Sequence, residues 1–322
     1  MWQWRDQVVL VTGGSGFFGR HLVNALQKRA VREVIIPRSQ QYDLREEAAH
    51  EALYRRHPHI TLVIHLAAVA GGIGANRAQP GVFYYDNIRI SSNALEYARR
   101  AGVPKFVGIG TICSYPKITA VPFREEDLWL GYPEETNAPY GLAKKMLLVQ
   151  SQAYRAQYGY NAIHLMPTNL YGPGDNFDLE TSHAIAAFIR RMTEARERGD
   201  DRIRLWGDGT PTRDYVYVED AVEAVLLAAE RYDEGEPVNI GSGQEISMHD
   251  LAKMVAGMVG FEGEIEWDTT KPNGQPRRCL DVARAERKFG FRASTPLREG
   301  LRETIHWYES ETAAVGLFST EA

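Results

Sequence analysis

The chain has 322 residues, of which 44% are hydrophobic and 25% charged, as is typical of a globular protein with one large or two unequal domains. A formal net charge of −5 gives no general attraction for nucleic acid, so any phosphate site must be local. No run approaches the ~20 apolar residues of a membrane span, and the first residues lack the apolar core of an export signal. Two cysteines form no disulfide framework, so we expect a cytoplasmic, reduced protein without nucleic acid, membrane or metal partners.

The first predicted element is a buried strand over residues 7–12, a short apolar run rich in β-branched side chains. Glycines in the spacing G-x-x-G-x-x-G follow it, and a helical pattern runs over residues 17–29. Glycines between a strand and a helix permit a tight turn and close approach of a pyrophosphate, while the helix N-terminus attracts the anion. This stretch predicts dinucleotide binding, with contacts from Gly13, Ser15, Gly16, Phe17, Phe18 and Gly19.

A second strand is predicted over residues 33–37, and Arg38 stands at its end. NAD-selective sites usually place an acidic residue near this point for the ribose 2′-hydroxyl, whereas an arginine suits a 2′-phosphate. No acidic residue appears until Asp43, so the sequence favours NADP over NAD, although Arg38 could equally be a solvated loop charge. Asp43 is placed to cap the next helix or to contact the adenine, and Leu44 beside it is a further candidate contact.

A third buried strand over residues 61–66 runs into the small-residue segment 67–76. Small residues at the end of a strand let a cofactor lie against the backbone, so Leu66, Ala67 and Ala68 are further candidate contacts. We interpret His65, inside the strand, as a core residue. After an amphipathic helix over residues 86–101 and a strand over residues 105–110, the segment 111–117 leaves the edge of a central strand, where chemistry is expected.

Tyr140 and Lys144 are four residues apart on a predicted helix and therefore share one face. An ammonium there favours the phenolate, so the phenol can act as an acid or base well below its ordinary pKa of ~10. Such a pair alone is more often a chance amphipathic pattern. Its position after Thr111 and behind the glycine-rich loop is what gives it weight.

The alternation of strands and helices through residues 161–166 is the doubly wound pattern. We therefore predict an α/β fold: a Rossmann-type parallel sheet with a smaller C-terminal substrate-binding lobe. Residues 1–171 plus about 213–242 are assigned to the dinucleotide-binding domain, since residues 214–218, the helix 219–231 and residues 238–241 read as a return to the main sheet. Residues 172–212 and 243–310 form the predicted lobe, which contains a helix over residues 182–198, and residues 311–322 a tail.

The glycine spacing, the upstream hydroxyl residue and the Y-x-x-x-K pair together resemble the extended short-chain dehydrogenase/reductases over nearly the whole chain. Within that group, several separated segments resemble the GDP-L-fucose synthases: residues 69–76, 113–117, 167–172, 175–177, 182–183 and 271–274. The resemblance implies epimerisation of GDP-4-keto-6-deoxy-D-mannose at C3 and C5, followed by reduction of C4 with NADPH.

The resemblance also implies roles for five residues. Thr111 hydrogen-bonds the reacting C4 oxygen, Tyr140 protonates that oxygen, and Lys144 lowers the pKa of the tyrosine and holds the nicotinamide ribose. Cys113 and His183 exchange protons at C3 and C5, although a lone histidine at a helix start could also be a cap. Inverting a carbon next to a ketone needs a base on one face and an acid on the other.

Further contacts are implied on both sides of the predicted site. Those expected at the cofactor are Pro167, Asn169 and Leu170, together with Tyr140, Lys144 and His183. Those expected at the substrate are Asn169, Arg191, Trp206, Arg213 and Lys271. An arginine suits a diphosphate as a forked donor, whereas each of these residues could also be structural.

The chain departs from the synthase pattern in three places. Ser15 stands where an arginine commonly contacts the 2′-phosphate, which leaves Arg38 as the candidate for that contact. Ile112 follows Thr111 where the synthases usually have a second serine, which makes the neighbouring pocket more apolar. Arg213 is followed by Asp-Tyr in place of Glu-Phe, which leaves open a different GDP-deoxyketosugar as substrate.

Four other readings compete. A 4,6-dehydratase would carry an acidic residue where Ile112 stands, and a GDP-mannose 3,5-epimerase without net reduction uses a lysine where His183 stands. A simple 4-epimerase needs neither Cys113 nor His183, and a non-enzymatic NADP-binding sensor usually loses the tyrosine or lysine. The resemblance further implies a homodimer formed through the helices at residues 86–101 and 140–158.

Overall fold

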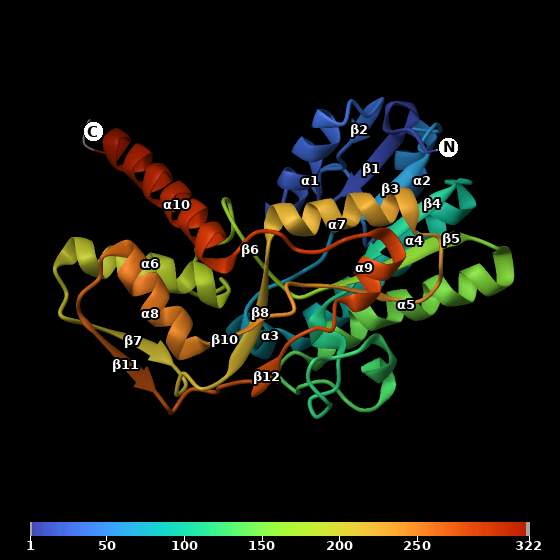
Figure 1. Cartoon of the computed structure of the whole chain (residues 1–322). Helices are drawn as coiled ribbons and strands as arrows, with labels where there is room; N and C mark the ends of the chain where they lie inside the picture. The colour runs from blue at the N-terminus through green and yellow to red at the C-terminus, as the bar shows by residue number, and fades with distance from the viewer. Residues whose placement is uncertain (1, 320–322) are drawn as a thin grey trace.

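A six-stranded, wholly parallel sheet forms the centre of the larger part of the molecule (Figure 1). The computed structural model describes the backbone of residues 2–319 and the side chains of residues 2–312. The strand order is β2-β1-β3-β4-β5-β9. The strands are β1 (Val8–Thr12), β2 (Glu33–Ile35), β3 (Leu62–His65), β4 (Lys105–Ile109), β5 (Asn161–Pro167) and β9 (Val238–Ile240). The predicted Rossmann-type sheet is confirmed.

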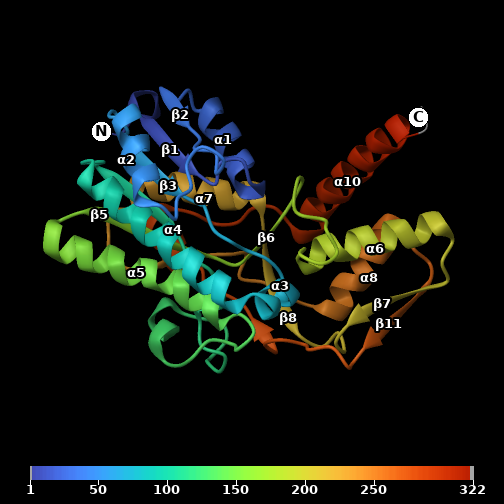
Figure 2. The same ribbon diagram turned by 180° about the vertical axis from the view of Figure 1, so that it is seen from behind.

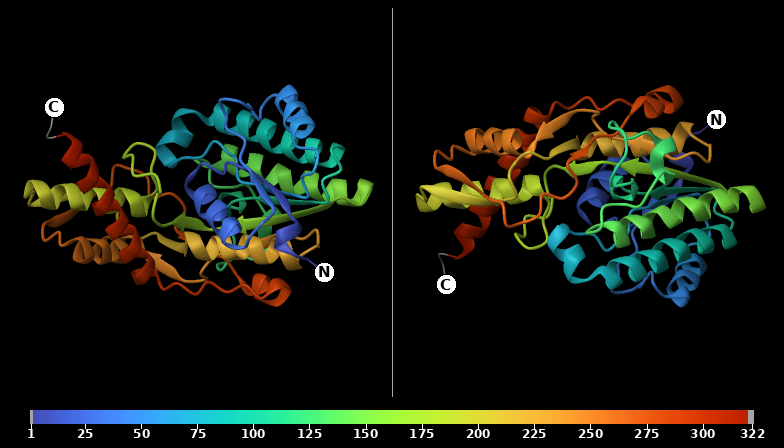
Figure 3. Two further views of the ribbon diagram at one scale, coloured as in Figure 1. Left: turned by 90° about the horizontal axis from the view of Figure 1, so that it is seen from above. Right: turned by 90° about the horizontal axis from the view of Figure 1, so that it is seen from below.

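Helices cover both faces of this sheet (Figure 3). Side chains alternate between the faces along each strand, and apolar side chains on both faces need a covering layer. Val9 and Val11 pack in the core of one face, and Val8 and Leu10 in the core of the other. The first face is covered by α1 (Phe17–Lys28), α7 (Val218–Arg231) and α9 (Ala283–Phe289). The second is covered by α2 (Glu47–Arg56), α4 (Pro80–Arg100) and α5 (Ala138–Tyr158), with α4 and α5 side by side (Figure 2).

Two helices begin elsewhere than predicted. Helix α4 starts at Pro80 rather than Asp86, because proline in the first turn has the backbone angle that a helix needs. Helix α2 starts at Glu47, since the Asp43 carboxylate accepts a hydrogen bond from the backbone N–H of Arg45 (3.0 Å) and forms a turn there. The short helix α3 (Ile73–Ala78) follows the small-residue segment after β3.

A second, smaller group of strands and helices has its own core, which includes Phe188, Leu205 and Leu251. Its mixed sheet contains β6 (Asn169–Tyr171), β8 (Thr212–Tyr217), β10 (Glu245–Ser247) and β12 (Arg277–Arg278). A parallel pair joins β7 (Arg202–Trp206) to β11 (Glu264–Asp268). The helices are α6 (Ala184–Arg198), α8 (Met248–Val259) and α10 (Leu297–Ser319).

The structure corrects one part of the predicted connectivity. Strand β8 was predicted in the main sheet, but it pairs with β6, β10 and β12, because β9 occupies the position beside β5. Helix α7 and strand β9 do return to the larger part. Helix α10 also continues through residues 311–319, where the sequence predicts a tail, and residues 320–322 lie outside the described residues. The division of the chain into two domains stays a prediction.

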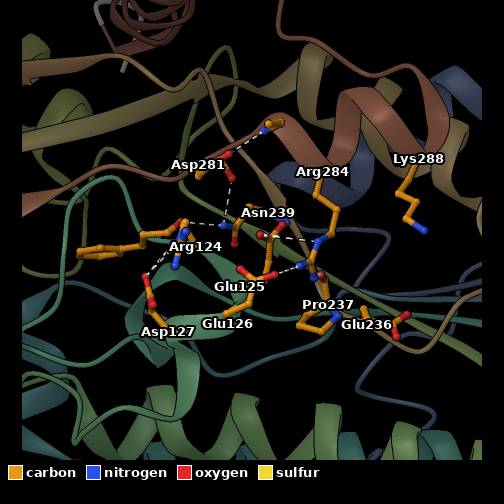
Figure 4. A network of polar contacts seen from close by, with 12 residues as sticks. Arg124, Glu125, Glu126, Asp127, Glu236, Pro237, Asn239, Asp281, Arg284 and Lys288 are labelled. Carbon is orange, nitrogen blue, oxygen red and sulfur yellow. Dashed lines mark hydrogen bonds and ion pairs between the residues drawn. The ribbon is translucent and has the colours of Figure 1, made fainter.

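A closed set of polar contacts, the Asn239 network, ties the segment after β4 to strand β9 and to the start of helix α9 (Figure 4). The Asn239 side chain accepts a hydrogen bond from the Tyr115 hydroxyl (2.7 Å) and donates to the carbonyls of Phe123 (3.0 Å) and Asp281 (3.1 Å). Its backbone N–H donates to the Glu125 carboxylate (3.0 Å). The side-chain oxygen, the side-chain nitrogen and the backbone N–H of buried Asn239 thus each have a protein partner.

Arg284 of helix α9 completes the Asn239 network. Its guanidinium lies 3.7 Å from the Glu125 carboxylate and donates to the Pro237 carbonyl at 2.9 Å. Among the helices that the structure describes, none is long and apolar enough to cross a membrane.

Candidate functional site

A cleft of about 580 Å3 lies where the carboxyl ends of the main-sheet strands meet the smaller group of elements. Gly13 follows β1, Leu66 follows β3, Gly110 follows β4, and Pro167 ends β5, and all four line the cleft. The strand order reverses between β1 and β3, and open α/β sheets bind ligands at such a switch point. The cleft therefore lies where the fold predicts a ligand site.

The glycine-rich loop after β1 has the geometry that a dinucleotide phosphate needs. Gly13 has a φ of +72°, and a side-chain carbon there would lie 2.8 Å from the backbone nitrogen of Ala67. A carbon at Gly19 would lie 2.2 Å from the Gly13 carbonyl oxygen, so only glycine lets helix α1 pack this closely. Helix α1 begins at Phe17 with no side-chain cap, which leaves its terminal N–H groups available to an anion. These residues fit a pyrophosphate.

Most predicted cofactor contacts line the cleft, but some do not. Those that line it are Gly13, Gly16, Phe17, Phe18, Gly19, Leu66, Ala68, Tyr140, Lys144, Pro167, Asn169, Leu170 and His183. Ser15, Arg38, Asp43, Leu44 and Ala67 lie outside its lining.

The residues outside the lining have other surroundings. Arg38 is exposed just beyond β2, and its guanidinium has no hydrogen-bond or ion-pair partner among residues 2–312. Asp43 is paired with Arg45 at 2.7 Å, and hydrogen bonds from Arg45 lower its pKa to about 2. Leu44 is buried, and the backbone N–H of Ala67 donates to the Thr12 hydroxyl at 3.3 Å.

Tyr140 and Lys144 both face the cleft from helix α5, and the Tyr140 ring packs edge-on against Phe83 of α4. Burial lowers the pKa of Lys144 to about 8. Burial, with a contribution from the charge of Cys113, raises the pKa of Tyr140 above its ordinary value. This direction is opposite to the one that the Tyr–Lys pair alone predicts, because the loss of water on burial is the largest cause of the shift. A neutral phenol is the form that can donate a proton.

Thr111 and Cys113 are held close to the same turn of α5. A side-chain carbon at Gly141 would lie 2.2 Å from the Cys113 carbonyl oxygen, so glycine is required for this approach. The Ser114 hydroxyl donates to the Gly141 carbonyl at 2.8 Å. The Thr111 hydroxyl accepts a hydrogen bond from the backbone N–H of Cys113 at 3.2 Å, which caps the short 3-10 helix η2 (Ile112–Ser114). The structure thus brings the predicted hydroxyl, thiol and phenol together.

Arg278 is a member of the site that the sequence did not reveal. Its Nη1 donates to Cys113 Sγ at 3.6 Å, and its side chain is buried. Strand β12 pairs with β8 so that Arg278 lies opposite Arg213, and both line the cleft. Neighbouring Arg277 is exposed and pairs with Glu245. Nothing in the sequence distinguishes the two arginines, because the pairing with β8 decides which one faces inward.

His183 lines the cleft as the residue just before helix α6. The His183 side chain is exposed in the open cleft, and the protein atoms around it, followed by the positive charge of Arg278, lower its pKa below its ordinary value. Helix α1 anchors the preceding loop, because Arg20 donates to the Gly174 carbonyl and the His21 ring contacts the Pro173 carbonyl, both at 2.8 Å.

Asp175, in the same loop, also lines the cleft, although it was not among the predicted site residues. Burial raises the pKa of Asp175 to about 7. The Asp-Asn-Phe segment to which it belongs was the available signal.

The predicted substrate residues Asn169, Arg191, Trp206 and Arg213 also line the cleft. Arg213 donates to the carbonyls of Thr212 and Gln275, both at 2.7 Å, and burial lowers its pKa to about 10. Trp206 is 51% exposed, and the ammonium of Lys271, which lies outside the lining, is 5.6 Å from its ring centroid.

The part of the cleft lined by Arg213 and Arg278 carries positive charge. Neither Arg213 nor Arg278 has an ion-pair partner among the described residues, which suits a ligand with two negative charges. Residues 2–312 contain no group of three His, Cys, Asp or Glu side chains placed to hold a metal ion.

Comparison with known proteins agrees with this geometry. The model of the NAD dependent epimerase/dehydratase family matches residues 9–241. A GDP-L-fucose synthase of Sinorhizobium fredii is 42% identical over 306 residues, covering 95% of this chain and 96% of the relative. That of Escherichia coli is 34% identical over 94% of this chain and 96% of its own. The crystal structure of a GDP-L-fucose synthetase from Naegleria fowleri bound to NADP superposes with a TM-score of 0.86 at 28% identity, covering 97% and 96% of the two chains.

Proposed function

The chain belongs to the NAD dependent epimerase/dehydratase family of extended short-chain dehydrogenase/reductases, and we propose that it is a bifunctional 3,5-epimerase and 4-reductase. The proposed substrate is GDP-4-keto-6-deoxy-D-mannose, and the proposed product is GDP-L-fucose. The observation that carries the proposal is that both pairs of predicted proton-transfer residues line one cleft: Tyr140 with Lys144, and Cys113 with His183. The relatives, which are GDP-L-fucose synthases, support this substrate.

In the proposed reduction, bound NADPH supplies the hydride that C4 receives. The neutral phenol of Tyr140 donates its proton to the C4 oxygen, and the Thr111 hydroxyl stabilises the charge on that oxygen with a hydrogen bond. The Lys144 ammonium holds the nicotinamide ribose and stabilises the phenolate that remains. The raised pKa of Tyr140 supports this direction, because the phenol begins the step with its proton.

In the proposed epimerisation, a base removes the proton from C3 or C5, and the electron pair passes to the C4 oxygen. The C–H bond breaks as the bond to the base forms, and Thr111 and Tyr140 stabilise the resulting enolate as they later stabilise the alkoxide. A proton then returns to carbon on the opposite face. Cys113 and His183 are the proposed proton carriers, and their positions on η2 and at the start of α6 support carriers on separate elements.

We propose NADPH as the cofactor, with Arg38 as the cation for its 2′-phosphate. Arg38 is exposed three residues beyond β2, which pairs with β1, and the NADP-bound Naegleria structure supports NADPH as the cofactor. Replacing Arg38 with Ala should raise the KM for NADPH about tenfold and leave that for NADH unchanged. Arg32, exposed at the opposite end of β2, is the matched control.

The decisive assay uses GDP-4-keto-6-deoxy-D-mannose with NADPH or NADH, in which cofactor absorbance and product are followed. Oxidation of NADPH with formation of GDP-L-fucose is expected. Solvent deuterium entering C3 or C5 without cofactor oxidation would leave an epimerase without net reduction, the second candidate function. If neither signal appears with this sugar, the proposed substrate is wrong.

We further propose a cytoplasmic location, from composition alone. We also propose a homodimer formed through α4 and α5. Exposed apolar and aromatic side chains support the dimer face: Val82, Tyr84 and Tyr85 on α4, and Met146, Val149 and Tyr158 on α5. Sedimentation should give twice the mass of the chain, and Tyr85→Glu combined with Val149→Glu should give the monomer. A monomeric wild-type protein would remove this proposal.

A further inference from the structure

We propose that Arg278 is a positioning residue for proton transfer by Cys113. Its guanidinium donates a hydrogen bond to Sγ that favours the thiolate, and Gln275 fixes the guanidinium in that position. The inference rests on the proposed role of Cys113, but the experiment below tests it without substrate.

The contact between the two side chains is direct and enclosed. Arg278 Nη1 lies 3.6 Å from Cys113 Sγ, and the arginine is only 7% exposed. A guanidinium carries a positive charge and has only donors to offer. A cation next to a thiol stabilises the thiolate, which is the form of cysteine that can accept a proton.

Gln275 connects the strand of Arg278 to the loop of Cys113. It is 3% exposed, and its amide oxygen accepts from Arg278 Nε at 2.9 Å. Its amide nitrogen donates to the carbonyls of Pro116 at 3.1 Å and Lys117 at 2.9 Å. Both ends of the amide are therefore engaged, and the contacts form a closed loop from Cys113 to Arg278, through Gln275, and back to the chain at Pro116 and Lys117.

The other charged and titratable groups near the thiol support this arrangement. Arg213 faces it from β8, Tyr140 from α5, and His183 lies near Arg278 at the start of α6. Glu134 lies near Arg213, but neither arginine forms an ion pair with a carboxylate among residues 2–312. Arg278 is the cation that contacts Sγ, whereas Arg213 donates to backbone carbonyls.

Arg278 also distinguishes the two proposed proton carriers. Its charge favours the Cys113 thiolate and disfavours the His183 imidazolium, which is the second cause of the lowered pKa of that histidine. The thiolate is therefore the carrier prepared to take the proton from carbon: the S–H bond forms, the C–H bond breaks, and the electron pair moves to the C4 oxygen. A negative sulfur also helps to keep Tyr140 protonated for the later reduction.

The test is the rate at which iodoacetamide alkylates Cys113 in the substrate-free protein across a range of pH. We expect Arg278→Met to slow alkylation at about pH 7 at least tenfold and to move the half-maximal rate to higher pH by about one unit. Arg278→Lys should restore part of the rate. Peptide mass spectrometry separates Cys113 from Cys279, whose pKa burial raises to about 12, and Cys113→Ser gives the background.

Arg277→Met is the matched control, because Arg277 is adjacent but pairs with Glu245 outside the cleft. It should leave alkylation unchanged. Gln275→Glu, which keeps the acceptor but loses both donors, should slow alkylation about threefold and provides a second variant if Arg278→Met does not fold. Alkylation in Arg278→Met at the wild-type rate and pH would overturn the proposal. That outcome is distinct from absence of activity in the wild-type protein, which would remove only the proposed substrate.

Discussion

Two polar clusters each take residues from the segment after β4 and from residues 278–284, and they differ in how their groups are satisfied. The Asn239 network joins Tyr115 and Glu125 to Asp281, and the polar groups of Asn239 in it are hydrogen-bonded to other parts of the protein. The cleft cluster consists of Thr111, Cys113, Tyr140, Lys144, His183, Arg213 and Arg278. Within the described residues, the Tyr140 hydroxyl, the Lys144 ammonium and the His183 ring have no hydrogen-bond partner.

This difference separates stability from function. Burying a polar group costs free energy unless a partner replaces the lost water, so a closed network is neutral or favourable, whereas the buried Lys144 of the open cluster, which has no partner among residues 2–312, is costly. The charges follow the same division, because Glu125 faces Arg284 in the closed network whereas Arg213 and Arg278 have no carboxylate partner among residues 2–312. The open cluster is explained if a dinucleotide and an anionic sugar nucleotide supply the missing partners.

The largest expected effect comes from removing the hydroxyl of Tyr140. Tyr140→Phe should lower kcat for NADPH oxidation about 1,000-fold, because no other group donates a proton to the C4 oxygen. The free energy of unfolding should hardly change, since that hydroxyl has no partner among the described residues. Steady-state kinetics and urea unfolding measure the two quantities.

Tyr115→Phe is the matched control for this prediction. It removes the same atom from the closed network, where the hydroxyl donates to Asn239. It should lower the free energy of unfolding by about 1–3 kcal/mol and leave kcat near the wild-type value. If the two variants had the same profile, the distinction between the clusters would fail.

Cys113→Ser should separate the two proposed reactions. A serine hydroxyl is a far weaker base than a thiolate, so deuterium exchange at C3 and C5 should fall about 300-fold. Hydride transfer to a substrate that is already epimerised should fall much less, since Tyr140 and Lys144 remain. Mass spectrometry of the product and NADPH oxidation follow the two steps, and equal loss in both would contradict the role given to Cys113.

Asn239→Ala tests the closed network. It leaves the Tyr115 hydroxyl and the carbonyls of Phe123 and Asp281 without their partner, which should cost about 3 kcal/mol in the free energy of unfolding. Urea denaturation measures the loss. The folded fraction should keep its KM for NADPH, because Asn239 does not line the cleft. A variant with unchanged stability and an altered KM for NADPH would show that Asn239 acts in the cleft, which would contradict its assignment to the closed network.

The sequence alone was enough to predict those site residues whose positions depend on neighbouring residues in the chain. Gly13 and Gly19 could be predicted because a strand, a loop and a helix follow one another, and the pair Tyr140 and Lys144 because four residues make about one helical turn. Cys113 and His183 could be named only through family resemblance, since seventy residues separate them in the sequence.

The remaining members of the site depend on pairing between distant segments. Arg278 faces inward because β12 pairs with β8 in one register, and a shift of one residue would bring Arg277 inward instead. The pairing of β8 with β6, β10 and β12 was also mispredicted, since an apolar strand pattern does not state which sheet the strand joins. Burial likewise decided the direction of the Tyr140 pKa, and burial is a property of the folded molecule.

The smallest expected effect compares two buried lysines, one from each kind of environment. Lys144 in the open cluster has a pKa lowered by burial to about 8, so its ammonium is present below that pH and is lost above it. We therefore expect kcat/KM for NADPH to fall about tenfold per pH unit above about pH 8, because this parameter reports groups of the free enzyme. Steady-state rates up to about pH 10 measure it.

Lys105 is the matched control for Lys144. It is also buried, but its ammonium donates to the Tyr232 carbonyl and to Asp233, both at 2.7 Å, and it lies outside the cleft lining. Lys105→Met should lower the free energy of unfolding, because the carbonyl and the carboxylate lose their donor, while the pH dependence of kcat/KM should stay that of the wild type. Lys144→Met should instead remove the fall above about pH 8 along with most of the activity. A wild-type profile that stays flat to about pH 10 would mean that Lys144 keeps its proton despite burial. Lys144 would then need a protein partner of the kind that Lys105 has.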